Sequence, residues 1–143
     1  MRGSDLLTLF ADSLAALRAE CPAAHLRMCA ALGRRVARLT IDGEVITLHG
    51  TGDGCEVAGE CPADLAAVRV VASRRALLDL MDGRESLEEA VLGDRVEIWG
   101  AADDLLALHE GLRWYVLGGV RAPSFERLAE KFRGEVEERY GGR

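Results

Sequence analysis

The spacing of the apolar residues changes near residue 35 and changes back near residue 73, and this limits the fold more than any other feature of the sequence. Residues 5–19 carry apolar side chains at helical spacing. Residues 35–50 alternate as two strands, joined at Asp42-Gly43, a dipeptide typical of tight hairpin turns. Helical spacing returns in residues 74–83. A run of strands that helices precede and follow predicts an α+β fold.

Proline and glycine residues divide the chain into further elements. Pro22 is suited to open a helix and Gly33 to end it. The apolar residues 66–73 predict a strand in the middle of a sheet. The other expected elements are a short strand at 55–58, helices at 87–93, at 105–119 and from Pro123, and a strand at 95–100.

The segment 71–100 has the clearest boundaries between elements. Ser73 is placed to cap a helix that Gly83 ends. Ser86 and Glu89 match the capping box S-x-x-E, which predicts a second short helix directly after the first.

This succession of a strand, two short capped helices and a strand ending on glycine resembles the sterol carrier protein 2 (SCP2) domain family. The resemblance is best over residues 66–112, and the positions that carry it are Ser73, Leu77, Leu80, Gly83, Ala90, Gly93, Val96, Ile98 and Gly100. It implies one domain over residues 1–143, with a sheet of about five largely antiparallel strands and helices packed on one side. It also implies an apolar tunnel between sheet and helices that holds fatty acyl chains, sterols or similar molecules.

Apolar side chains on two of the expected helices are candidates for the wall of such a tunnel. They are Leu77, Leu80, Met81, Leu105, Leu108, Leu112 and Trp114. The alternative is that these side chains simply fill the core, because an apolar helical stripe indicates burial without saying against what. Trp99 also has more than one possible role, as a core residue, as a wall of the ligand site or as part of an interface.

The charge of the chain argues against one class of partner. Its 143 residues carry a formal net charge of −6, and its pI is about 5.1. Because nucleic-acid binding depends on neutralising phosphates with basic residues, no nucleic acid is expected as a partner. One local basic cluster, Arg34, Arg35 and Arg38, is interpreted as a solvated strand edge. The alternative is a contact with a phosphate or an anionic lipid head group.

Targeting signals are not evident in the sequence. The first ten residues, "MRGSDLLTLF", place an Asp before any apolar stretch, unlike a secretory signal peptide. No apolar run approaches the roughly 18 residues of a membrane-spanning helix, so no integral membrane association is expected. We therefore expect a cytoplasmic protein, and the abundance of Arg and Ala favours a bacterial origin.

The cysteines raise the question of a metal site. Cys21, His25 and Cys29 follow at spacings of four residues, which would place all three on one helix face. The four cysteines lack the C-x₂-C spacing of zinc ribbons, and reduced, buried thiols are the preferred interpretation. We expect neither a metal nor a cofactor.

Motifs typical of catalysis are missing from the sequence. It has no G-x-S-x-G elbow, and "GTGDG" at residues 50–54 is not followed by the Lys-Ser/Thr of a phosphate loop. We expect a protein that is not an enzyme and that binds and carries a hydrophobic small molecule, a lipid, acyl or sterol-like compound. The alternative is a structural module of the same fold with a filled core, which docks to a partner protein or forms a homodimer. The C-terminal helix, residues 124–139, is expected to be part core and part lid.

Overall fold

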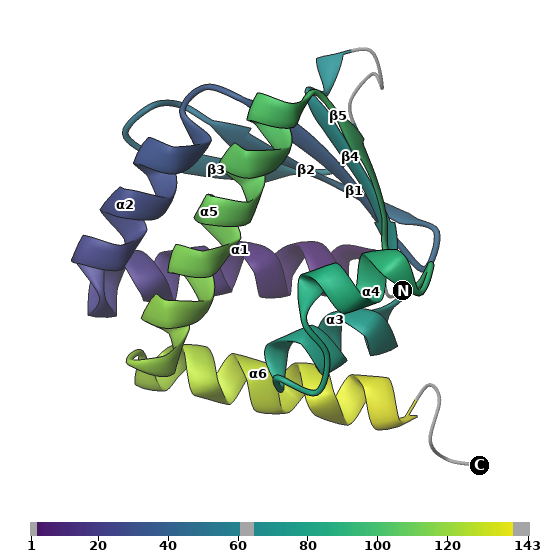
Figure 1. Ribbon diagram of the computed structural model, residues 1–143. Helices are drawn as coiled ribbons and strands as arrows, with labels where there is room; N and C mark the ends of the chain where they lie inside the picture. Colours follow the sequence, from purple (N-terminus) through teal and green to yellow (C-terminus); the bar gives the residue numbers. More distant parts are fainter. Residues whose placement is uncertain (1–2, 61–64, 139–143) are drawn as a thin grey trace.

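The computed structural model describes residues 3–60 and 65–138 and contains helices and strands in the order that the sequence predicts (Figure 1). The helices are α1 (Gly3–Glu20), α2 (Pro22–Leu32), α3 (Arg74–Met81), α4 (Leu87–Leu92), α5 (Ala102–Val120) and α6 (Pro123–Val136). The strands are β1 (Val36–Ile41), β2 (Glu44–Gly50), β3 (Cys55–Ala58), β4 (Val68–Ala72) and β5 (Glu97–Gly100).

The strands form one five-stranded sheet in the order β3-β2-β1-β4-β5. Three of the neighbouring pairs are antiparallel, and β1 and β4 are parallel. The expectation of about five largely antiparallel strands is confirmed. The parallel pair arises because the chain leaves β3 at one edge of the sheet and crosses back to lie beside β1, as parallel neighbours require.

The turn between β1 and β2 follows from its two residues. Asp42 has φ 53° and Gly43 has φ 85°, the left-handed pair that a tight hairpin turn needs. The buried Arg74 ties this turn to the start of α3. Its guanidinium donates to Glu44 Oε1 at 2.6 Å and to Asp42 Oδ2 at 3.4 Å. A buried cation needs such partners, so the hairpin and α3 are fixed to each other.

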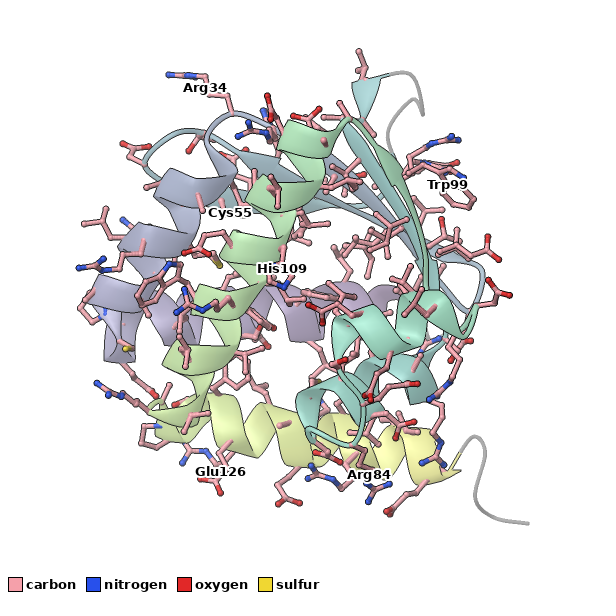
Figure 2. All side chains as sticks on the ribbon, viewed as in Figure 1. Arg34, Cys55, Arg84, Trp99, His109 and Glu126 are labelled. Carbon is pink, nitrogen blue, oxygen red and sulfur yellow. The ribbon has the colours of Figure 1, made fainter. Side chains whose placement is uncertain are left out.

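The sheet has one face covered by helices and one face in water (Figure 1). On the covered face the inward side chains of β1 and β4 are buried. On the other face Trp99 is 45% exposed and points away from the helices (Figure 2). It lies beside Arg69, whose guanidinium carbon is 5.4 Å from the ring centroid. The interpretations of Trp99 as a core residue or a ligand wall are therefore wrong, because the alternation of β5 turns it outward.

The main core lies between the covered face of the sheet and helices α1, α3, α4 and α6. Ala90 of α4 is fully buried in it, as is Val136 of α6, and Phe132 is buried nearby. The C-terminal helix is therefore part of the core at Phe132 and Val136, which confirms the expectation that it is part core. The expectation that it is also part lid stays a prediction. Tyr140, which the sequence places on the same face, lies outside the described residues.

A second core joins α1, α2 and α5 through close contacts at glycines. A Cβ atom added at Gly118 would stand 2.3 Å from Leu17 Cδ1 and 2.7 Å from Ala24 Cβ. One added at Gly111 would stand 3.0 Å from Leu32 Cδ2. The missing side chains let α5 approach α1 and α2 closely, and α5 packs more extensively on α2 than on any other element.

Helix caps are mostly as the sequence predicts. Ser73 accepts a hydrogen bond from the backbone of Ala76 at 3.0 Å, and Ser86 and Glu89 form the expected capping box. The start of α5 differs, because the helix begins at Ala102 and places Asp103 and Asp104 in its first turn. There they favour the helix through its dipole and do not cap it. No helix within the described residues is long and apolar enough to cross a membrane.

The contact at Gly118 gives a stability prediction. We expect Gly118→Ala to lower the free energy of unfolding by about 1–3 kcal/mol, because the new methyl group overpacks the contact with Leu17. Gly134→Ala is the control, since a Cβ there meets nothing within 4 Å. It should leave stability unchanged or raise it by up to about 1 kcal/mol. Urea unfolding of both variants measures the difference, and a Gly118→Ala protein as stable as the parent would contradict the packing described.

Candidate functional site

Helices α3 and α5 and strand β5 present large apolar side chains that are neither buried nor fully exposed. Those that pack against the main core are Leu77, Leu80, Met81, Ile98, Leu105 and Leu108. Leu112 continues the row on α5 and is 37% exposed. We call these seven side chains the apolar rim. An apolar side chain left partly in water is a place where a ligand can remove further apolar surface from water.

The apolar rim is only partly covered because α3 and α5, which carry most of it, pack mainly on other helices and not on each other. Helix α5 packs mainly on α2, and α3 packs on α6, although both cover the same face of the sheet (Figure 1). The contact between α3 and α5 is not extensive. Leu105, Leu108 and Leu112 follow one another at helical spacing, so they share the side of α5 that α2 leaves uncovered.

Trp114 lies apart from the rim. It packs against the second core, and its indole nitrogen donates to Glu110 Oε2 at 2.9 Å. The guanidinium carbons of Arg27 and Arg113 lie 5.0 Å and 5.6 Å from its ring centroid. Trp114 is two residues beyond Leu112, so its side chain leaves α5 on a different side of the helix. The structure therefore does not bring Trp114 together with the other six predicted site residues.

Two apolar positions near the rim were not among the predicted site residues. Ile98 was expected only as part of the strand at 95–100, and it packs on the same core as the rim helices. Val116 is 37% exposed and stands one turn beyond Leu112. Helical spacing from Leu112 is the signal that could have found Val116, whereas the position of Ile98 depends on how the strands pair.

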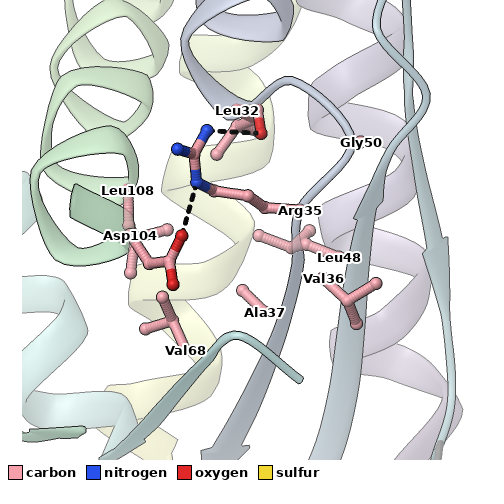
Figure 3. Close-up of a pocket in the computed structure, with 9 residues that line it drawn as sticks. All are labelled: Leu32, Arg35, Val36, Ala37, Leu48, Gly50, Val68, Asp104 and Leu108. Atoms are coloured by element: carbon pink, nitrogen blue, oxygen red, sulfur yellow. Dashed lines mark hydrogen bonds and ion pairs between the residues drawn. The ribbon is translucent and has the colours of Figure 1, made fainter. Parts of the chain in front are cut away.

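A small cavity lies where α2, α5 and the sheet meet (Figure 3). Its volume is about 10 Å³, enough for about one water molecule. Leu108 is the only predicted site residue among those that line it, which are Leu32, Arg35, Val36, Ala37, Leu48, Gly50, Val68, Asp104 and Leu108. At this place the space between sheet and helices is therefore too small for a lipid.

An ion pair lies beside this cavity. Arg35 Nε donates to Asp104 Oδ1 at 2.8 Å, and Arg35 Nη1 donates to the carbonyl oxygen of Leu32 at 3.4 Å (Figure 3). The pair joins the C-terminus of α2 to the first turn of α5. Because both side chains are partly in water, its contribution to stability is at most about 1 kcal/mol. Of the three arginines in the basic cluster, Arg35 is thus used to hold two helices together.

An open depression lies between α1 and α6 and has a volume of about 520 Å³. It is lined by Asp12, Ala15, Ala16, Ser124, Arg127, Leu128 and Lys131. Charges of both signs surround a floor of small side chains, so the depression lacks the continuous apolar lining of the rim. This depression could not be predicted from local sequence patterns, because its two helices are more than a hundred residues apart in the chain.

The thiol and imidazole groups of the second core are held in their neutral forms. Burial, together with Arg18, lowers the pKa of His25. Burial also raises the pKa of Cys29, and it raises the pKa of Cys55 to about 11. Thiols of this kind are poor nucleophiles at neutral pH. Within residues 3–60 and 65–138, no three side chains of the metal-binding types are grouped so as to hold an ion.

Comparison with solved structures identifies the fold. The chain is similar to a ubiquinone synthesis protein, UbiJ-SCP2, with a TM-score of 0.64 and 18% identity over 82% of this chain and 94% of that one. It is also similar to Sterol Carrier Protein 2 from Yarrowia lipolytica in its apo form, with a TM-score of 0.53 and 16% identity over 74% and 92% of the two chains. The sterol carrier protein domain 2 of Helicoverpa armigera gives a TM-score of 0.53 and 15% identity over 78% and 86%.

These likenesses confirm an SCP2-like α+β fold with a mixed five-stranded sheet. The resemblance drawn from residues 66–112 is confirmed at the level of the fold. No protein-family model matches the chain, and no curated protein sequence is significantly similar to it.

Tyr115 anchors α5 to α1 and α6. Its ring contacts those of Phe10 and Phe125, with centroid distances of 6.4 Å and 5.0 Å. Its hydroxyl oxygen is 2.6 Å from Ser13 Oγ. Burial of the phenol raises the pKa of Tyr115 to about 12, although the hydrogen bond with Ser13 opposes this.

This pKa predicts a loss of stability in alkali. In the unfolded chain a tyrosine titrates near pH 10, so between about pH 10 and 12 the unfolded state loses the proton first. The free energy of unfolding should therefore fall over this range, by up to about 2–3 kcal/mol. Chemical unfolding at a series of pH values measures it. Tyr115→Phe should show a smaller decline than the parent, and equal declines would contradict a buried phenol at this position.

Proposed function

We propose that the chain binds a hydrophobic small molecule at the apolar rim and carries it without catalysing a reaction. The observation that supports this most is the rim itself, where six large apolar side chains on the core and Leu112 beside them remain partly in water.

The driving force would be removal of apolar surface from water. A ligand that covers roughly 300 Å² of apolar surface gains about 7 kcal/mol before the costs of association. Micromolar affinity corresponds to a binding free energy of about −8 kcal/mol. We therefore expect a ligand that covers more apolar surface than the area assumed above.

For a ligand of this size we propose that α3 and α5 move apart at the rim. The cavity beside Leu108 does not serve as the site, because it lies between α2, α5 and the sheet and holds about one water molecule. A ligand that binds an open conformation better than a closed one shifts the protein toward it. The limited contact between α3 and α5 means that few interactions oppose such a movement.

The ligand class follows from the chemistry of the rim and from the named neighbours. Leucine, isoleucine and methionine side chains offer no charged partner, which favours a ligand with a long apolar chain or ring system. The structurally similar proteins are a ubiquinone synthesis protein and sterol carrier proteins. We therefore select isoprenoid quinones, sterols and fatty acids as the first probes.

The alternative is an interaction module of the same fold whose core stays filled. The small volume of the cavity at Leu108 favours this alternative. Such a module would bind none of the apolar probes and would instead associate with another protein or with itself. The same set of variants distinguishes the two proposals.

Ligand binding predicts a selective effect at Leu112. We expect at least one fluorescent or displacing probe to bind the parent protein at tens of micromolar or tighter, which is about −6 kcal/mol. Leu112→Glu should weaken binding at least about tenfold, because it places a charge on the rim. Leu26→Glu is the matched control, a more exposed leucine on α2 away from α3, and it should bind as the parent does.

Two results would contradict the proposal. One is the failure of isoprenoid quinones, sterols and fatty acids to bind at all. The other is an equal loss of affinity in Leu112→Glu and Leu26→Glu. Absence of probe binding together with a concentration-dependent change of mass in light scattering would support the interaction module.

A further inference from the structure

We propose that the outer face of α5 docks onto the surface of a lipid bilayer that contains anionic lipids. This face consists of Leu106, Arg113, Leu117, Val120 and Arg121, with Val116 at its border with the rim. The inference does not depend on the proposed ligand, because Leu106, Leu117 and Val120, which carry it, are exposed and do not belong to the rim.

The outer face is unusually apolar for a helix surface in water. Leu106 is 67% exposed, Leu117 is 45% exposed and Val120 is 82% exposed. Residues 113, 116, 117 and 120 follow one another at helical spacing, so they form one continuous strip. A contiguous strip of this kind indicates a contact with a partner or a membrane, in contrast to single scattered apolar residues.

Basic side chains border this strip. Arg113 and Arg121 belong to α5 and its C-terminal end, and Arg27 reaches from α2 to the ring of Trp114. Glu110 is the acidic side chain beside them, and it already pairs with Arg113 at 3.2 Å and with Trp114. This excess of arginine stands in a chain whose formal net charge is −6.

The combination of basic and apolar side chains on this face favours a lipid bilayer as its partner. Anionic head groups attract juxtamembrane arginines, while leucine and valine side chains enter the boundary between head groups and acyl chains. Tryptophan is also enriched at that depth, and Trp114 lies beside Arg113 of this face. A bilayer with anionic lipids therefore complements both the apolar strip and its arginines.

A second copy of the chain fits the face less well. A symmetric dimer brings the same surface of each copy together. Arg113 and Arg121 would then face their own counterparts, and Glu110, the acid beside them, is already paired with Arg113. Like charges across an interface oppose association.

Vesicle sedimentation tests the proposal with the full chain. We expect it to bind vesicles of phosphatidylcholine with about one third phosphatidylglycerol, and to bind pure phosphatidylcholine vesicles at least about tenfold more weakly. The double variant Leu117→Glu with Val120→Glu should bind the anionic vesicles at least about tenfold more weakly than the parent. Leu92→Glu is the control, since Leu92 is 85% exposed on α4, outside this face.

Fluorescence quenching locates the contact. In Trp99→Phe the remaining Trp114 should be quenched by lipids brominated near the head group. In Trp114→Phe the remaining Trp99, on the uncovered face of the sheet, should not be quenched. All these positions are exposed or partly exposed, and thermal unfolding checks that each variant is folded.

Four results would overturn the proposal. They are no binding of the parent to anionic vesicles, equal losses in the double variant and in Leu92→Glu, quenching of Trp99 in place of Trp114, and a dimer in solution that the double variant converts to monomer. The last result would assign the face to self-association. Failure of the apolar probes at the rim would leave the vesicle results unaffected, so the two proposals are tested separately.

Discussion

The close packing of α5 on α1 and α2 determines most of what is distinctive in this structure. Gly111 and Gly118 have no side chains, and Leu32, Leu17 and Ala24 occupy the space that a Cβ would need. Helix α5 is therefore held toward α2 and does not close against α3. The same contact separates the faces of α5. One face is buried in the second core, one forms part of the rim, and one is turned to solvent.

This arrangement relates the two proposals to each other. Leu112 and Val116, on neighbouring sides of α5, are both partly exposed, and Leu117 and Val120 continue the apolar surface outward. A hydrophobic molecule that left a bilayer at the outer face would meet apolar side chains on its way to the rim.

Features set by neighbouring residues could be predicted from the sequence. The Asp42-Gly43 turn, the caps at Ser73 and Ser86, and the start of α2 at Pro22 depend on local backbone chemistry, and the structure has them where they were expected. Helical spacing also predicted that the leucine and methionine side chains of the rim are apolar helix positions, and their role in ligand binding stays a prediction. Trp114 was grouped with them because it lies near in sequence, yet its direction on the helix takes it to α2.

Features that depend on distant residues could not be predicted in the same way. Arg35 and Asp104 are 69 residues apart, and nothing local pairs them. The parallel β1–β4 pair and the contact of Gly118 with Leu17 also depend on the route of the whole chain. The presence of an open tunnel is a further example, because spacing indicates which side chains are apolar but not how much space lies between them.

The most direct test of the central claim is to observe where a bound apolar probe lies. Intermolecular NOEs between a bound isoprenoid or fatty acid and labelled methyl groups would locate it. We predict NOEs to the methyl groups of Leu80, Met81, Leu105 and Leu112, and none to Leu14 or Leu17 of the second core. NOEs confined to the second core or to the depression between α1 and α6 would contradict a ligand site at the apolar rim.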